Sequence, residues 1–450
     1  MNEDRSEKKT RLRARDVGIS TFGNVTLLSS AVVQAPLLAQ SLGVDQRGVL
    51  AGAIAPLTLL IGIATLGIPE ASTHFIARRT EKPSHILFRG AAVVVGLGIA
   101  ASVIVAEFAE PFASGNSQLA ELIKLAAIAL PLALLTALLR AAAAGAGAWS
   151  LIAVERAIFG GTRLGGLVVL LLIGQLTVFS ATLLMAASTF VGSLAYILLP
   201  SRLKHHKADQ YHRASLVRYG SRFWIGSLTG VLLTRLDQFL MVPLSSLEQL
   251  GLYAVAVSIA EIPLVISMAV RDVIFSVESE STSAKRVCAA ARITTFAVLM
   301  MAVGIAIVAI PVVPLAFGKE FSGSIGPATI LLCGMVIVTG GSIGGMAVAA
   351  RGYPGLRSIA LACAALTNAL LLIVLLPRQG AMGAALATLA GNFVYGVIAI
   401  HISSRKLGTR YRDYLGIRRT DIQTLCLVIA ALTRKLNLRR RRPAVKATSE

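Results

Sequence analysis

Charged side chains are scarce in this sequence. Of its 450 residues only 14% are charged, whereas 55% are hydrophobic and the mean hydropathy is +0.75. Soluble domains carry about 25% charged residues, and a surface with so much less charge could not cover this much apolar side chain in water. A water-soluble fold is therefore excluded, and the sequence predicts a protein whose solvent is lipid.

Signatures of enzymes and metalloproteins are also missing. The sequence has no nucleotide-binding loop of the GxxxxGK[ST] type, which excludes ATP hydrolysis by this chain as its source of energy. No cluster of His, Cys or carboxylate residues has the spacing of metal ligands. The four cysteines are interpreted as small packing residues because they lie in or beside apolar runs: Cys288, Cys333, Cys363 and Cys426. We expect no catalytic residue, no cofactor and no metal.

Twelve apolar runs are long enough to be membrane spans, since a helix needs about 20 apolar residues to cross the hydrocarbon core. They lie at residues 17–42, 48–70, 86–108, 119–140, 149–173, 175–200, 223–247, 251–271, 290–317, 325–350, 356–376 and 381–402. The predicted fold class is therefore all-α, a polytopic membrane protein of about 12 transmembrane helices.

Lysine and arginine lie almost entirely on one side of these spans. If the N-terminus is cytoplasmic, the inner segments hold 36 of these residues and the outer loops hold 3, namely Arg47, Lys319 and Arg378. Cytoplasmic loops of membrane proteins carry such an excess. We therefore predict a multi-pass protein of the cell membrane with both termini in the cytoplasm. The net charge of +21 is assigned to contact with anionic lipids on that side, not to nucleic acid.

The widest internal basic loop divides the spans into six and six. The predicted organisation is a basic N-terminal segment (1–16), a first six-helix bundle (17–200), a basic linker (201–222), a second six-helix bundle (223–402) and a basic C-terminal tail (403–450). Within the tail, TLCLVIAALT at 424–433 is too short to span. It is either an interfacial helix, which RRRR at 439–442 holds beside anionic lipid, or part of a loosely ordered tail.

Two sequence echoes suggest that the halves are an internal repeat. DQRGVLAGAI at 45–54 resembles EQLGLYAVAV at 248–257, and PFASGNSQ at 111–118 resembles EFSGSIGP at 320–327. Chance similarity in sequence rich in alanine and glycine is the alternative. Because six spans return the chain to the same side of the membrane, a true repeat would be parallel, with its axis along the membrane normal.

Six charged residues within the predicted spans are the candidate functional residues, because an ionised side chain at the bilayer centre costs roughly 2.5–3.5 kcal/mol. The candidates for substrate binding are Arg163, Arg235, Arg156 and Lys124, and those for ion coupling or an ion pair are Asp237 and Glu261. Arg156 and Arg163 are seven residues apart, so they project from one face of the fifth span, with Gly160 on the same face. A structural arginine bonded to a carbonyl group is the alternative for Arg163.

Arg235 and Asp237 are two residues apart and point to nearly opposite sides of their helix. They cannot pair with each other, and Glu261, at similar depth on the next span, is the expected partner of Arg235. This pair is either a fixed structural ion pair or one that titrates or senses substrate. Glu70 and His74 are interpreted as interfacial residues at the cytoplasmic end of the second span.

Four segments resemble bacterial polysaccharide flippases. They are YGSRFWIGSLTGVLLTRLDQFLMVPLSSLEQLGLYAVAVSIAEIP (219–263), AFGKEFSGSIGPATILL (316–332), MGAALATLAGNFVYG (382–396) and LGVDQRGVLAGAIAPLTLLIGIATLGIPEASTHFIAR (42–78). The resemblance covers about residues 17–402. It implies the superfamily of multidrug, oligosaccharidyl-lipid and polysaccharide exporters, in which two six-helix bundles form a V around a central cavity.

The leading hypothesis is a flippase, not an enzyme. The resemblance implies that it moves an undecaprenyl-diphosphate-linked oligosaccharide from the inner to the outer leaflet by alternating access, for cell-surface polysaccharide biosynthesis. Guanidinium groups can bind its diphosphate bidentately, and polymerase or glycosyltransferase machinery is a further expected partner. One alternative is a cation-coupled multidrug exporter, in which Asp237 or Glu261 exchanges a proton or sodium ion for a cationic drug. A membrane polysaccharide polymerase would need a large outer loop or clustered carboxylates, and neither is found.

Overall fold

The computed structural model describes residues 2–203, 215–278, 282–416, 418 and 421, and this part of the chain is helical without a β-strand. The predicted interfacial helix at 424–433 lies outside the described residues. The α-helices are α1 (Asn2–Ala64), α2 (Ile68–Ala77), α3 (Pro83–Phe112), α4 (Ser117–Ala127), α5 (Leu130–Gly145), α6 (Trp149–Leu172), α7 (Val178–Ser193), α8 (Leu199–Leu203), α9 (Leu216–Leu244), α10 (Leu247–Ala260), α11 (Leu264–Glu278), α12 (Ala284–Val312), α13 (Ile325–Ala350) and α14 (Pro354–Leu407). Four short helices join them: η1 (Leu194–Leu198), η2 (Val313–Phe317), η3 (Lys319–Ser324) and η4 (Tyr411–Asp413).

Two of the long helices each contain two membrane crossings. α1 turns at Gly43, with φ of 74°, and α14 turns at Gly380, with φ of 51°, a left-handed backbone that glycine adopts without steric cost. Seven helices of the described chain are long and apolar enough to cross, or eight with α10 and α11 counted as one span bent by 51°. Dividing α1 and α14 at their kinks, and adding the long but charge-bearing α6 and α9, accounts for the twelve predicted crossings.

Helix boundaries differ from the predicted ones at two basic segments. α1 begins at Asn2, so the predicted N-terminal segment continues the helix of the first span. Its Glu, Lys and Arg residues are strong helix formers, and Pro36 is the first proline of the chain. α9 begins at Leu216, seven residues before the predicted span, because hydropathy marks where lipid contact starts and not where a helix starts.

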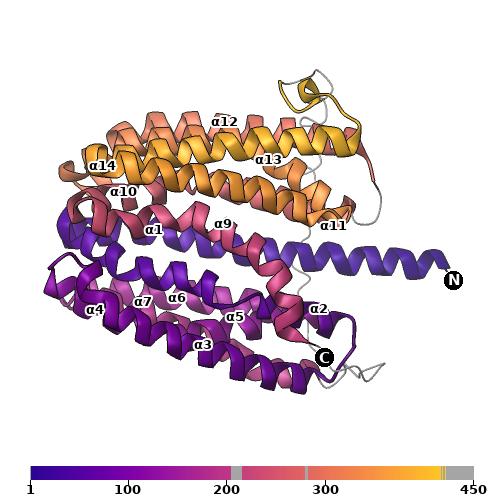
Figure 1. The fold of residues 1–450 in the computed structure, drawn as a ribbon, viewed down its shortest axis with the longest axis horizontal. Coiled ribbons are helices and arrows are strands. Elements are labelled where there is room, and N and C mark those ends of the chain that lie inside the picture. The colour runs from indigo at the N-terminus through magenta and orange to yellow at the C-terminus, as the bar shows by residue number, and fades with distance from the viewer. Residues whose placement is uncertain (1, 204–214, 279–281, 417, 419–420, 422–450) are drawn as a thin grey trace, which may run out of the picture.

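The helices form two groups, with α3 to α7 on one side and α10 to α14 on the other, and α1 and α9 run between them (Figure 1). The start of α1, together with α2 and α11, lies at one end of the molecule. We name it the inner end because the basic segments lie there. α4 and α10 lie at the opposite, outer end (Figure 1). α1 packs against both α9 and α10 and so joins the two groups.

Toward the outer end the two halves share one large hydrophobic core. That core contains fully buried side chains from both halves, such as Leu50 and Leu119 of the first and Leu250 and Tyr253 of the second. Toward the inner end the buried clusters belong almost wholly to one half, for example Ile86 and Leu138 in the first. The halves therefore share their core toward the outer end. They also meet at the inner end, where a Cβ atom on Gly67, between α1 and α2, would lie 2.1 Å from the carbonyl oxygen of Gly220 in α9.

Equivalent ion pairs close the inner loops of the two halves. Arg89 at the start of α3 bonds to the nearly buried Glu81 at 2.5 Å, and Arg286 at the start of α12 bonds to the buried Glu278 at 2.9 Å. In each pair the arginine follows the glutamate by eight residues, in the loop between the second and third spans of its half. This equivalence supports the parallel repeat.

Candidate functional site

A cavity of about 440 Å³ lies between the first half and α9, in the inner half of the helices. Its volume is in the range of small-molecule binding sites. The residues that line it are Ile61, Gly62, Thr65, Pro69, Glu70, Thr73, Ala137, Arg140, Ala141, Ala144, Trp149, Ile152, Arg156, Ser227 and Val231. We refer to this space as the inner cavity.

Two arginines line the inner cavity. The turn between the antiparallel α5 and α6 brings Arg140 to Glu155, and the guanidinium donates two hydrogen bonds of 2.8 and 3.2 Å to the buried carboxylate. Arg156 follows Glu155 and lines the cavity. Its side chain also lies against α1, where its Cδ is 3.4 Å from the position a Cβ would take at Gly23. Arg156 is thus the predicted substrate-binding residue that the structure places in a cavity.

The second half contributes to the inner cavity through its contact with α2. The hydroxyl of Ser227 on α9 donates a 3.1 Å hydrogen bond to Oε1 of Glu70, whose Oε2 is buried without a partner. One turn earlier, the indole of Trp224 donates to the carbonyl of Ile63 at 2.7 Å. Glu70, which the sequence suggested to be interfacial, is therefore part of the cavity wall.

Arg163 lies further out on α6, on the face that packs against α1. The hydroxyl of Ser30 in α1 donates to the carbonyl of Gly160, one turn before Arg163, at 2.9 Å. The guanidinium of Arg163 lies over the ring of Phe159, 5.0 Å from its centroid. α1, which also carries Arg47, packs against α6. Neither arginine lines the inner cavity, so the structure separates Arg163 from Arg156.

The expected partner of Arg235 is confirmed. Its guanidinium lies 3.5 Å from the carboxylate of Glu261, and both side chains are about one-third exposed. Asp237 points elsewhere and is almost buried, where it accepts a 2.5 Å hydrogen bond from the hydroxyl of Tyr253. Thr388 and Asn368 extend this cluster, and the side-chain oxygen of Asn368 has no partner.

Lys124 lies apart from the other predicted site residues. Its ammonium group is 2.9 Å from Glu110, and both side chains are exposed near the outer end. α4 begins at Ser117, so Lys124 is only two turns inside the outer end, and its long side chain reaches the surface. The structure therefore does not bring Lys124 to the cavity.

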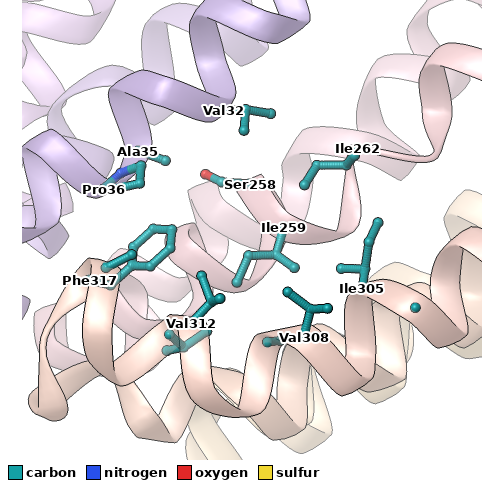
Figure 2. Close-up of a pocket in the computed structure, with 14 residues that line it drawn as sticks. Val32, Ala35, Pro36, Ser258, Ile259, Ile262, Ile305, Val308, Val312 and Phe317 are labelled. Carbon is teal, nitrogen blue, oxygen red and sulfur yellow. The ribbon is translucent and has the colours of Figure 1, made fainter.

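An apolar pocket of about 280 Å³ opens between α1, α10 and α12 (Figure 2). Val32 and Pro36 of α1 face Ile259 of α10 and Val308 and Val312 of α12 across it (Figure 2). Ser258 is the one polar side chain of its lining, and its hydroxyl already donates to a backbone carbonyl within α10. The pocket lies within candidate membrane spans, so its walls offer contacts only to apolar groups.

At the outer end the two halves meet at a pair of glycines. A Cβ atom on Gly48 would lie 1.8 Å from the carbonyl oxygen of Leu247, and one on Gly251 would lie 2.2 Å from that of Val44. Only glycine permits backbones to approach this closely. Gly48 and Gly251 occupy equivalent positions in the first sequence echo. We call this contact the outer closure.

Three charged residues described above were not predicted. Arg47 was assigned to an outer loop, Arg140 was counted only as an inner charge, and Glu155 was not singled out. A signal existed for the last two, because Arg140 and Glu155 flank a short break between two helices and carry opposite charges. No local signal identifies Arg47, which enters the membrane region because α1 continues beyond the kink at Gly43.

The fold resembles those of membrane transporters. An inward-facing multidrug resistance MATE family transporter of the MOP superfamily gives a TM-score of 0.67 at 12% sequence identity, over 85% of this chain and 94% of that one. A MOP superfamily transporter from Pyrococcus furiosus, described as having a binding pocket of reverse polarity, gives 0.63 at 13% identity, over 88% and 95%. The lipid II flippase MurJ in an inward closed conformation gives 0.62 at 15% identity, over 90% and 92%.

The sequence itself matches one family. No curated protein sequence matches the chain significantly. Residues 14–280, more than half of the chain, match the model of the family described as "Polysaccharide biosynthesis protein". With its all-helical fold and apolar spans, the chain is a multi-pass membrane protein and belongs to the polysaccharide biosynthesis protein family.

Proposed function

We propose that the protein moves a polyprenyl-diphosphate-linked oligosaccharide from the inner to the outer leaflet of the cytoplasmic membrane, for cell-surface polysaccharide biosynthesis. The observation that carries this proposal is the inner cavity, which Arg140 and Arg156 line together with the polar residues Thr65, Glu70, Thr73 and Ser227. A diphosphate cannot enter hydrocarbon unaided, and a desolvated guanidinium binds it through charge-assisted hydrogen bonds. Arg156, the predicted substrate-binding residue, lines this cavity beside Arg140, and we assign the phosphates to it.

Other groups of the inner cavity suit a saccharide. The carboxylate of Glu70 can accept hydrogen bonds from sugar hydroxyls, and Trp149 offers a flat apolar surface to a sugar ring. The apolar pocket between α1, α10 and α12 suits a stretch of isoprenoid chain, which would stay on the lipid side while the head group crosses. A polar cavity and a separate apolar pocket in one protein fit a substrate that is itself amphipathic.

Alternating access would follow from the way the halves meet. The outer closure at Gly48 and Gly251 joins the halves at the outer end, while the cavity lies toward the inner end, which we assign to the cytoplasm. Gly67 and Gly220 bring the halves similarly close at the inner end, so entry of substrate would require that contact to part. In this orientation the basic segments and both termini face the cytoplasm and its anionic lipids. Transport would require the outer closure to part and the helices around the cavity to approach each other.

A proteoliposome assay tests the proposal. The purified chain is reconstituted with a polyprenyl-diphosphate-linked oligosaccharide, and the fraction of glycan exposed on each leaflet is followed with time. We expect flipping by the wild type, a loss of roughly tenfold or more in Arg156→Gln, since one charged hydrogen bond is worth about 1.5–3 kcal/mol, and no change in the exposed outer control Arg378→Gln. The proposal would be refuted if the wild type did not move the glycan between leaflets. It would also be refuted if the protein lengthened the glycan and did not move it.

A cation-coupled multidrug exporter is the second candidate, and the buried Asp237 is the observation that favours it. A carboxylate with hydroxyl and amide neighbours but no cationic partner among the described residues is suited to taking up a proton or a small cation. Accumulation of cationic dyes in proteoliposomes separates the candidates. Dye transport that Asp237→Asn abolishes, without movement of the lipid-linked glycan, would support the exporter.

A further inference from the structure

Arg47 of α1 and Arg163 of α6 lie in the outer half of the first bundle, on helices that pack against each other, and we refer to them as the cationic pair. In the described residues neither forms an ion pair or a side-chain hydrogen bond, and the Nε atom of each is buried without a partner. The ring of Phe159 covers one face of Arg163. Two guanidinium groups that act on each other in a medium of low polarity repel more strongly than they would in water. An anion between them would remove this repulsion and occupy the unused donors.

The fold does not itself require an arginine at position 47. In the first sequence echo the equivalent residue of the second half is Leu250, which is fully buried in the shared core. At the equivalent position of the second half, a leucine is sufficient for packing between the helices. The charge is thus specific to the first half, and packing does not explain it.

The position of the pair relates it to both ends of the transport path. Arg163 lies two helical turns from Arg156, about 10 Å along the axis of α6, and the side chain of Arg156 lies against α1 at Gly23. Arg47 precedes Gly48, whose backbone forms the outer closure. Between Arg156 and Arg163, the hydroxyl of Ser30 in α1 donates a hydrogen bond to the carbonyl of Gly160, so α1 and α6 are in contact there.

From these relationships we propose that Arg47 and Arg163 are a second anion site, which receives the phosphate groups of the substrate after Arg156 and releases them when the outer closure opens. This proposal rests on the proposed function. Movement of α1 away from α6 breaks the contact between Ser30 and Gly160 and joins the inner cavity to the pair. Separation of Gly48 from Gly251 then displaces the adjacent Arg47 and frees the phosphates toward the outer leaflet.

The test compares binding with movement in the full-length protein. For Arg47→Gln/Arg163→Gln we expect binding of the lipid-linked glycan within about threefold of wild type and flipping reduced by roughly 100-fold, the effect of two lost charged contacts. Arg156→Gln should instead weaken binding by about tenfold. Arg47→Lys/Arg163→Lys should recover part of the flipping, and Arg378→Gln should change neither quantity. Flipping in the double glutamine variant within threefold of wild type would overturn the proposal.

A second measurement does not depend on flipping. Inorganic pyrophosphate should raise the melting temperature of the wild type, and more than that of Arg47→Gln/Arg163→Gln. If this difference is seen and the wild type moves no lipid-linked glycan, the proposed function fails while the anion site stands. If the rise in melting temperature caused by pyrophosphate requires Arg47 and Arg163 but the flipping rate does not, the two arginines bind a free anion. The proposed transfer of phosphates from Arg156 is then overturned. Equal shifts in both proteins would overturn the anion site itself.

Discussion

Arg351, the residue after α13, donates two hydrogen bonds, of 2.7 and 3.1 Å, to the fully buried carboxylate of Glu278 at the end of α11. Arg286 and the backbone N–H of Ser283 bond to the same carboxylate. Glu278 thus ties together the inner ends of α11, α12 and α13, beyond the membrane-spanning part of α11. These bonds hold the inner ends of the three helices together. The second half can therefore move against the first as a rigid body.

The hydrogen bonds around Glu278 predict that the free energy of unfolding falls at acidic pH. Burial raises the pKa of Glu278, but the hydrogen bonds from Arg351, Arg286 and Ser283 outweigh it and hold the pKa below its usual 4.5. The contribution to the free energy of unfolding is therefore complete above that value and is lost as the pH falls through the lower, folded-state pKa. Glu278→Gln should lower the free energy of unfolding by about 2–3 kcal/mol at neutral pH, because two arginines lose their counter-charge.

Denaturant unfolding in detergent between pH 3 and 8 measures this effect. The difference between wild type and Glu278→Gln should be constant at neutral pH and shrink toward the acid end of the range. The exposed Glu248→Gln is the matched control and should stay within about 0.5 kcal/mol of wild type. A difference that does not change with pH would show that the carboxylate charge contributes nothing.

The ion pair beneath the inner cavity predicts a non-additive result. Arg140→Met leaves the buried carboxylate of Glu155 without its partner and should cost about 2 kcal/mol, less than a fully buried pair because Arg140 is 42% exposed. Arg140→Met/Glu155→Met removes both charges and should recover most of this loss. Thermal unfolding of the wild type, both single variants and the double variant forms the cycle. A double variant as unstable as the sum of the singles would contradict the pairing.

Much of this architecture could be predicted from the order of apolar runs and from residue depth within them. Counting residues along the spans placed Arg235 and Glu261 at a similar depth in the membrane. Asp237 lies two residues from Arg235 and so was predicted to point to the opposite side of the helix, away from this pair. Depth alone gives neither the lateral neighbours of a residue nor the reach of its side chain, so Lys124 was grouped with residues from which it is distant. Arg47 was missed for another reason: hydropathy ended the loop at residue 48, whereas the kink at Gly43 starts the helix earlier.

Filling the apolar pocket should slow transport without unfolding the protein. A Cβ added at Gly304 meets nothing within 4 Å, so Gly304→Leu projects its side chain into the space proposed for the isoprenoid chain. Leucine also favours the helix more than glycine does, by about 0.8–1 kcal/mol. We expect flipping to fall by roughly tenfold, or about 1.4 kcal/mol of barrier, with an unchanged or higher melting temperature. Ile307→Phe, on the exposed face of the same helix, is the control, and a normal rate in Gly304→Leu would exclude the pocket from the path.

Bulk at the outer closure should shift the protein away from the state described here. Gly251→Val puts a branched side chain where even a Cβ lies 2.2 Å from the carbonyl oxygen of Val44, so the backbones of α1 and α10 must separate. Spin labels on cysteines introduced at the exposed Asp45 and Glu248, in a background without native cysteines, report the distance between the halves. We expect a longer mean distance and slower flipping in Gly251→Val. Gly96→Val in α3, where a Cβ meets nothing within 4 Å, should change neither. An unchanged distance in Gly251→Val would mean that this contact does not seal the outer end.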